Sequence, residues 1–261
     1  MNDNPINGKN EEEEYFPGIY NYCDRWCQKC AFNSRCLNYS LEEEISEHLP
    51  PGHAEDALSR IKLIFEEISS MLDSFIEKEG IDLESLPEMD EEKEEEIRKI
   101  IEEHPITKLA VEYESKVNDW FKKNNKNIEK FVIELRESVE EGKATGDPID
   151  DILSLHDVID IIIYYFTFIE VKLRRAIRDK HETFFDAEFR ELDKNLSAKL
   201  ALIGIDRSYD AWEILDEIVA GKGNMNASSF VKLLDDLRNL VEVEFPDARS
   251  FIRPYFDSIE E

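Results

Sequence analysis

The sequence has no cysteine beyond position 36, although the first 36 residues of this 261-residue chain contain four. Glycine and proline are scarce, with nine of each, which favours helices joined by short connections. Cations are outnumbered, because 32 Lys and Arg face 61 Asp and Glu and the formal net charge is −29. This balance opposes binding to nucleic-acid phosphates and to anionic lipid, and it favours a protein partner that is basic.

A long apolar run is also lacking. The most hydrophobic stretch, Val158 to Val171, contains Asp160 and Glu170 and is shorter than the ~20 apolar residues that a membrane span needs. It therefore predicts a buried core helix and no membrane partner. The first fourteen residues, MNDNPINGKNEEEE, lack the apolar segment of a secretory signal and predict a disordered acidic tail. We expect a soluble, cytoplasmic protein, in which clustered thiols stay reduced and bind metal more often than they form disulfides.

Apolar residues recur with helical periodicity along most of the chain, and no alternating pattern of useful length indicates a strand. The predicted helical segments are 55–78, 91–103, 109–121, 128–140, 148–180, 192–220 and 228–244. The fold class is therefore all-α, a bundle of about five or six helices over residues 41–261. A four-cysteine metal-binding module at 15–40 and the disordered acidic tail at 1–14 precede it.

Several details of these helices follow from single residues. Pro105 should end or kink the helix that begins near residue 91. Residues 161–169 and 200–205 are apolar on nearly every face and should be surrounded by other helices. Ser228 or Ser229 is expected to cap the last helix. LEEEISEH, residues 41–48, should form one or two turns.

All four cysteines lie within fourteen residues at the spacing C-x3-C-x2-C-x5-C, as Cys23, Cys27, Cys30 and Cys36. Three interpretations remain open. Two disulfides would mostly close very small loops, which bring little gain in chain entropy. A structural zinc ion takes four thiolates, but usually from two close pairs separated by a longer stretch. A [4Fe–4S] cluster is also held by four cysteine thiolates, and a short loop suffices to wrap it.

The segment CQKCAFNSRC, residues 27–36, resembles the C-x2-C-x5-C iron–sulfur element of helix-hairpin-helix DNA glycosylases. It also resembles the element of iron–sulfur RecB-type nucleases, which often carry an aromatic residue two positions after the second cysteine, as Phe32 is here. In both groups the fourth thiol lies upstream, where this chain has Cys23. The resemblance implies a [4Fe–4S] cofactor. It does not extend to the glycosylase hairpin or to the nuclease D…E-x-K core, so it implies no DNA chemistry.

The residues around the cysteines suit a thiolate cluster. Arg25, Lys29 and Arg35 are cations in an acidic protein, and they are expected to offset the thiolate charge and to help keep the thiols deprotonated. Nearby aromatic residues would either shield a cluster from water or dock the module on the bundle. They are Tyr20, Tyr22, Trp26, Phe32 and Tyr39.

A second constellation lies in the predicted core helices. His156 and Asp160 share a helical face at i, i+4, as a helix-borne metal site requires. Asp206 and Arg207 follow the apolar run LALIGI and must be paired or reach solvent. The candidate mates are Glu170, Arg174 and Arg175. A structural ion-pair network and a ligand pocket are both compatible with this set, and Gly204 indicates close helix approach or room for a ligand.

The sequence contains no G-x-G-x-x-G, P-loop, G-x-S-x-G or H-E-x-x-H motif, so it does not decide whether the protein is an enzyme. The leading hypothesis is a helical metalloprotein that binds a [4Fe–4S] cluster, structural or electron-transferring, with a basic or redox protein partner. One alternative is a zinc-stapled helical interaction module. The other is an enzyme with a second site in the bundle, around His156, Asp160, Glu170 and Arg207.

Overall fold

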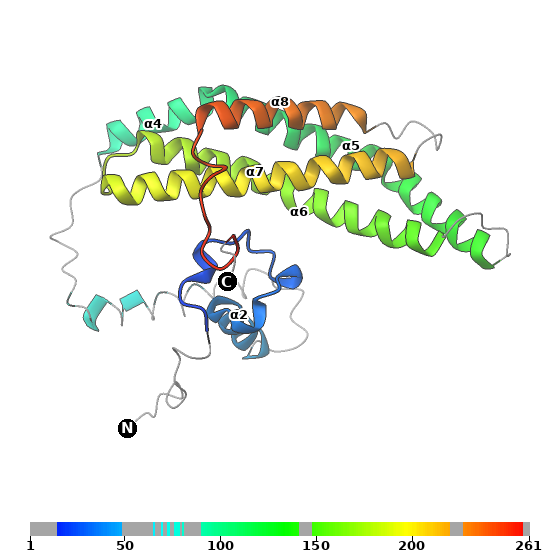
Figure 1. Cartoon of the computed structure of the whole chain (residues 1–261), viewed down its shortest axis with the longest axis horizontal. Helices are drawn as coiled ribbons and strands as arrows, with labels where there is room; N and C mark the ends of the chain where they lie inside the picture. Colours follow the sequence, from blue (N-terminus) through cyan, green and yellow to red (C-terminus); the bar gives the residue numbers. More distant parts are fainter. Residues whose placement is uncertain are drawn as a thin grey trace. The chain divides into compact units, whose positions relative to one another are not determined.

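The structure is a computed structural model, and it describes residues 15–48, 90–140, 148–219 and 227–257 together with scattered positions between 65 and 80 (Figure 1). The described residues group into two compact units, on either side of the boundary between Glu91 and Glu92. Each unit is helical, and the described residues contain no strand, which confirms the predicted all-α fold. None of the described helices is long and apolar enough to cross a membrane. The tail predicted at 1–14 and most of the helix predicted at 55–78 lie outside the described residues.

The first unit holds the cysteine module, residues 15–40. Three short 3-10 turns, η1 (Ile19–Asn21), η2 (Cys27–Lys29) and η3 (Asn33–Arg35), lead into the helix α2 (Leu37–His48). This helix is three turns long and begins directly after Cys36, so the predicted one or two turns were too few. Further along the unit, Gly80 has a φ of +65° and its amide donates to the carbonyl of Glu77. Glycine in this left-handed conformation commonly ends a helix.

The second unit begins with α4 (Glu91–Glu103) and α5 (Pro105–Glu140). The predicted break at Pro105 is confirmed, because proline is the first residue of α5, where a missing amide hydrogen costs nothing. His104 lies between the two helices, and its Nδ1 accepts a hydrogen bond from the amide of Ile106 at 3.3 Å. The remaining helices are α6 (Pro148–His181), α7 (Ala187–Ile218) and α8 (Ser228–Glu244).

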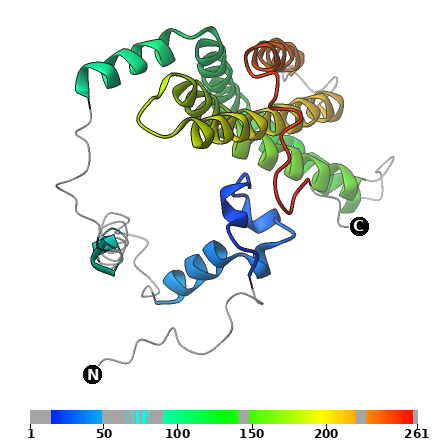
Figure 2. The same cartoon turned by 60° about the vertical axis from the view of Figure 1, so that its left-hand side comes forward.

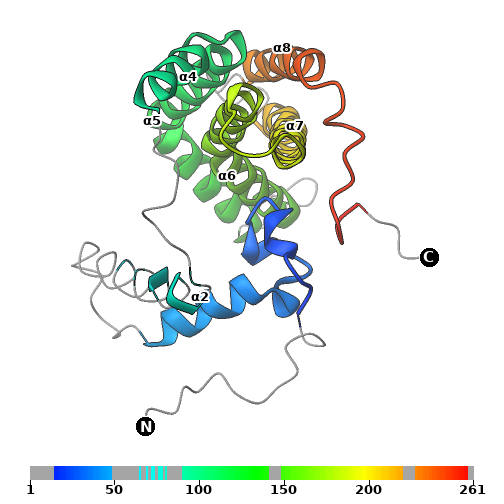
Figure 3. The same ribbon diagram turned by 90° about the vertical axis from the view of Figure 1, so that its left-hand side faces the viewer.

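Four of these helices form an up-down-up-down bundle. The principal contacts run from α5 to α6, from α6 to α7, from α7 to α8 and from α8 back to α5. Figure 1 shows the alternating chain direction, and Figure 3 views the bundle from one end. Short connections between successive antiparallel helices are typical of this architecture. The fold therefore places every long helix against two neighbours.

Aromatic rings from α5, α7 and α8 fill the core of the bundle. The rings of Trp212 and Phe230 stack at 4.0 Å and 8°, and Trp120 meets Trp212 edge-on at 5.1 Å. The indole Nε1 of Trp212 donates to the hydroxyl of Tyr113 at 3.0 Å, and both side chains are fully buried. Burial raises the pKa of Tyr113 to about 12, so this hydroxyl stays neutral at physiological pH.

The structure corrects the prediction that separate helices cover 109–121 and 128–140, because α5 is continuous through the polar sequence KKNNKN. The reason is Asn124, which is 1% exposed and occupies a core position one turn after Trp120. Its amide donates to the Trp120 carbonyl at 2.9 Å, so a polar residue continues the buried stripe to Ile128. Buried polar side chains are tolerated when they find such a partner.

The start of α7, the cap of α8 and the burial of one residue also differ from the sequence prediction. The helix α7 begins at Ala187 instead of residue 192, because Asp186 caps it by accepting the amide of Phe189 at 2.8 Å. No serine caps α8, whose N-cap residue is Ala227. Residues 200–205 are buried on all sides or nearly so, as predicted, whereas Ile163 in the run 161–169 is 49% exposed.

Candidate metal centre

Each cysteine lies at a junction of the cysteine module. Cys23 follows η1, Cys27 begins η2, and Cys30 ends it by donating its amide to the Cys27 carbonyl at 3.2 Å. Cys36 ends η3 and precedes α2, where its carbonyl accepts the amide of Ser40 at 3.1 Å. All four thiols are free, with Cys36 buried and the others half-buried. The short turns therefore bring four donors of one type into a segment of fourteen residues.

Backbone amides donate to two of the sulfurs. The amide of Phe32 donates to Sγ of Cys30 at 3.4 Å, two residues along the chain. The amide of Arg25 donates in the same way to Cys23 and lowers its pKa. Arg25 has a φ of +62°, a left-handed conformation that few residues other than glycine adopt. Amide hydrogen bonds of this kind stabilise thiolate ligands and tune the potential of iron–sulfur clusters.

Contacts between the two ends close the module. The amide of Phe16 donates to the carbonyl of Arg35 at 3.0 Å, and the Arg35 guanidinium lies 3.8 Å from the centroid of the Phe16 ring. Phe16 also meets Phe32 edge-on at 5.9 Å. Among the described residues 15–40, however, Ile19 and Cys36 alone are buried. A segment below about 40 residues with so small a core usually needs a disulfide or a metal to hold it.

Two of the thiols, those of Cys23 and Cys27, have a raised pKa. Burial is the main cause that raises the pKa of Cys27 to about 11, and the neighbouring cysteines and Glu42 add to it. Burial also raises the pKa of Cys23, with Asp24 contributing. The expectation that nearby cations help to keep the thiolates of a bound cluster deprotonated stays a prediction, because these shifts concern the thiols without a metal. A metal that binds them as thiolates must displace these protons.

The four sulfurs are not gathered as tightly as one metal ion requires. Within the part of the chain that the structure describes, one set of three or more candidate ligands has all its donor atoms within 4.8 Å of one another, and it contains no cysteine. Four thiolates around one zinc ion lie about 3.8 Å apart, because each Zn–S bond is about 2.3 Å and the geometry is tetrahedral. A cubane binds each thiolate through a different iron and accepts a wider spread.

The set of close donors is His156, Asp157 and Asp160 on α6, with His156 Nδ1 3.3 Å from Asp160 Oδ2. His156 and Asp157 are exposed. Glu170 lies about three helical turns further along and pairs with Arg174 of its own helix. The structure therefore does not bring His156, Asp160 and Glu170 to one site.

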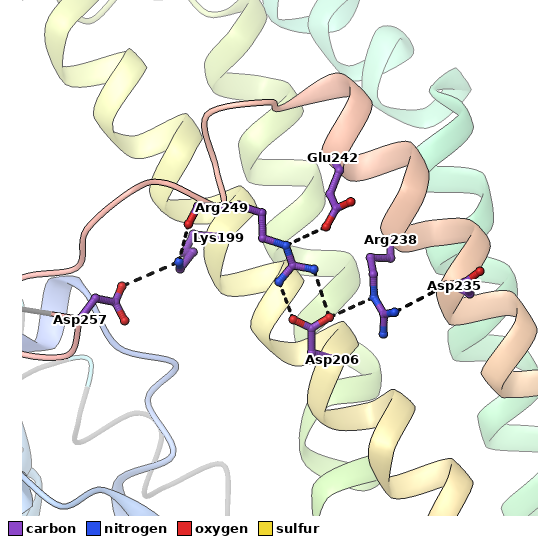
Figure 4. A network of polar contacts seen from close by, with 7 residues as sticks. All are labelled: Lys199, Asp206, Asp235, Arg238, Glu242, Arg249 and Asp257. Carbon is purple, nitrogen blue, oxygen red and sulfur yellow. Dashed lines mark hydrogen bonds and ion pairs between the residues drawn. The ribbon is translucent and has the colours of Figure 1, made fainter.

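Asp206 and Arg207 face different partners. The hydroxyl of Tyr165 on α6 accepts a hydrogen bond from Arg207. Asp206 pairs with Arg249 and, at 3.0 Å, with Arg238 (Figure 4). The two arginines expected as mates for the charges after LALIGI do not pair with Asp206, because Arg174 pairs with Glu170 and Arg175 with Asp193. This arrangement is a structural ion-pair network, one of the two outcomes that the sequence left open.

The network extends from α7 to the segment after α8. Arg249 Nε donates to Glu242 at 2.7 Å, so Arg249 joins Asp206 of α7 to Glu242 of α8 (Figure 4). Lys199 Nζ donates to the Arg249 carbonyl at 2.8 Å and lies 4.0 Å from Asp257. These contacts fix the C-terminal segment on the bundle.

Sequence reasoning missed a second charged cluster between α6 and α7. Arg175 donates through Nε and Nη2 to the carboxylate of Asp193 at 2.7 and 2.8 Å, and Asp193 is 8% exposed. Asp179 shares a hydrogen bond with Asp193. The signal was available in part, since Asp193 lies at helical spacing from the apolar residues Leu196 and Leu200.

Comparison of the chain with protein-family models, with curated proteins and with solved structures yields no match.

Proposed function

We propose that this protein binds a [4Fe–4S] cluster through Cys23, Cys27, Cys30 and Cys36. The observation that carries the proposal is the donor set itself: four free thiols in a small segment that has little core of its own. Their spacing along the chain resembles that of known [4Fe–4S] elements, and four cysteine thiolates are the ligands that such a cluster takes. When bound, such a cluster supplies one-electron redox chemistry. Its role is to hold the module together or to exchange electrons with a protein partner.

The chain's own residues support such a cofactor in two ways. The amides of Arg25 and Phe32 donate to Cys23 and Cys30, which stabilises bound thiolates and adjusts a redox potential. The closed loop between Phe16 and Arg35 holds the ligand segment in one conformation. The acidic surface of the protein, with its net charge of −29, favours a basic partner and disfavours nucleic acid.

The test is the metal and sulfide content of the full chain purified without oxygen, together with its visible spectrum. We expect a brown protein with about four irons and four acid-labile sulfides per chain and a broad visible absorption band. Substitution of any one of the four cysteines by serine should lower the iron content, and Ser34→Ala within the same segment should leave it unchanged.

The competing function is a zinc-stapled helical interaction module. A colourless protein that holds one zinc per chain, lost in the same cysteine variants, would establish that function and reject the cluster. A protein with neither metal and with all four thiols reactive would reject both. Reduction of the brown protein, followed by its electron paramagnetic resonance spectrum, separates an electron-transfer role from a purely structural one. A cluster that no mild reductant or oxidant changes is structural.

A further inference from the structure

The turn between α6 and α7 presents three phenylalanine rings to solvent. Phe184, Phe185 and Phe189 are 55%, 52% and 52% exposed. The ring centroids of Phe184 and Phe185 are 5.3 Å apart, and those of Phe185 and Phe189 are 5.5 Å apart. Leu192, 41% exposed, lies three residues after Phe189 on α7 and extends the apolar face. We name these four residues the phenylalanine tip. Exposed apolar clusters of this kind usually mark an interaction surface.

Hydrogen bonds hold this turn in one conformation. The carboxylate of Glu182, which is 5% exposed, accepts the amides of Thr183 and Phe184 at 2.6 and 2.7 Å. Arg190 donates to the carbonyls of Glu182 and Phe185 at 2.6 and 3.0 Å. A preorganised surface loses little conformational freedom on binding, which favours affinity. These hydrogen bonds therefore fix the backbone of the turn while its phenylalanine rings remain exposed to solvent.

The surroundings of the phenylalanine tip are acidic. Three exposed acidic residues, Asp186, Glu188 and Glu191, lie in the segment 179–193, and the two basic residues of that segment are engaged within the chain. Lys180 Nζ lies 2.5 Å from Glu244, and Arg190 binds the turn's carbonyls. The helix α4, with seven acidic and three basic residues, starts at the same end of the bundle (Figure 2). Its Glu94 pairs with Arg178 of α6 at 2.6 Å.

We propose that the phenylalanine tip docks a basic amphipathic helix of another protein. Its apolar side would cover Phe185, Phe189 and Leu192, and its Lys and Arg side chains would meet the surrounding carboxylates. A second copy of this chain would bring the same acidic surround against itself, and anionic lipid would be repelled for the same reason. The proposal stands on the second unit alone and is independent of the cluster.

The probe is a fluorescent peptide of about 18 residues, with Leu on one helical face and Lys on the others. Its binding to the full chain is followed by fluorescence anisotropy. We expect Phe185→Ser/Phe189→Ser to weaken binding about tenfold or more, because aromatic anchors dominate such surfaces. The matched control is Val243→Ser/Ile252→Ser, which alters two residues that are 82% and 60% exposed elsewhere on the same unit. That control should stay within about twofold of the parent chain.

Charge is tested separately, with variants that leave the rings intact. Glu188→Lys adjoins the phenylalanine tip, and Asp236→Lys on α8 is its control with the same change of charge; both positions are exposed. We expect the first to weaken the Lys peptide several-fold more than the second. A peptide in which Glu replaces every Lys should not bind. Circular dichroism and melting curves verify that each variant is folded.

Several results would overturn the proposal. Equal loss of binding in the ring variant and its control would show unspecific attraction to an acidic protein. A dimer in sedimentation velocity that Phe185→Ser/Phe189→Ser dissociates would assign the surface to a second copy. Binding to neutral phosphatidylcholine vesicles that the same variant abolishes would assign it to a membrane.

Discussion

The carboxyl pair between α6 and α7 predicts a pH dependence of stability that one substitution removes. Asp179 lies half-buried beside Asp193, which in turn accepts two hydrogen bonds from Arg175. Burial, the hydrogen bond to Asp193 and the charge of Asp193 raise the pKa of Asp179 to about 7, although Arg175 and Arg178 oppose them. Asp179 therefore holds a proton at mildly acidic pH, and once that proton is lost its carboxylate lies beside the negative charge of Asp193.

The sign of the effect follows from proton linkage. In the unfolded chain this carboxyl titrates near pH 4, so between about pH 4 and pH 7 the folded state holds a proton that the unfolded state releases. The stability that Asp179 contributes is fully present below about pH 4 and is lost as the pH rises through about 7. A rise in pKa from about 4 to about 7 corresponds to a change of about 4 kcal/mol in the free energy of unfolding. Solvent screening at the partly exposed Asp179 reduces this change to about 2 kcal/mol.

The perturbation is Asp179→Asn, which keeps the shape of the protonated carboxyl and does not ionise. Urea unfolding followed by circular dichroism gives the free energy of unfolding at about pH 5.5 and about pH 8, both above the isoelectric point near 4.5. About half of the effect falls in this window, so the variant should gain about 1 kcal/mol over the parent chain on going from the lower to the higher pH. Asp236→Asn, at an exposed position of α8, should show no such gain. If the free energy of unfolding of Asp179→Asn, relative to that of the parent chain, stays constant or falls as the pH rises, the reasoning is refuted.

Three further predictions concern the close helix contact, a helix cap and the metal. A Cβ at Gly204 would lie 3.0 Å from side-chain atoms of both Ile169 and Tyr165, so Gly204→Val should lower the free energy of unfolding in urea by about 1–3 kcal/mol. The control Ala187→Val, at an exposed position of the same helix, should lower it by less than about 0.5 kcal/mol. Equal losses in the two variants would contradict the close contact. Asp186→Ala removes the cap of α7 and should lower the free energy of unfolding by about 1 kcal/mol, whereas Asp186→Asn should restore most of it, and failure of that rescue would argue against capping. Removal of the proposed metal by acid and chelator should lower amide protection in residues 15–48 and leave the four bundle helices protected in hydrogen exchange; loss of protection in both units would show that they do not fold separately.

The sequence predicted best those features that depend on neighbours along the chain. Pro105 marks a helix boundary through its own ring, and the run at 200–205 is apolar enough to require burial on every side. The cysteine ligands were visible for the same reason, because all of them fall within one short segment. Their electrostatic environment was less visible, since the pKa of Cys27 is raised mainly by burial, which the local sequence does not give.

The features that sequence reasoning missed depend on contacts between distant segments. Asp206 pairs with Arg238 and Arg249, which lie more than thirty residues further along, and no local pattern indicates such a pairing. The continuity of α5 was missed because Asn124, a polar residue, occupies a core position and so interrupts the apolar pattern. Ile163 shows the reverse, since an apolar residue is not obliged to be buried.

Beyond Ala248, the last buried residue in the described part of the C-terminal segment, charged side chains supply many of the contacts of the chain's end. Attraction between partly exposed charges weakens as the ionic strength rises, whereas the burial of apolar helix faces does not. Salt should therefore release this stretch while the helices beneath it remain in place. A protease that cleaves after arginine would then cut there first in concentrated sodium chloride.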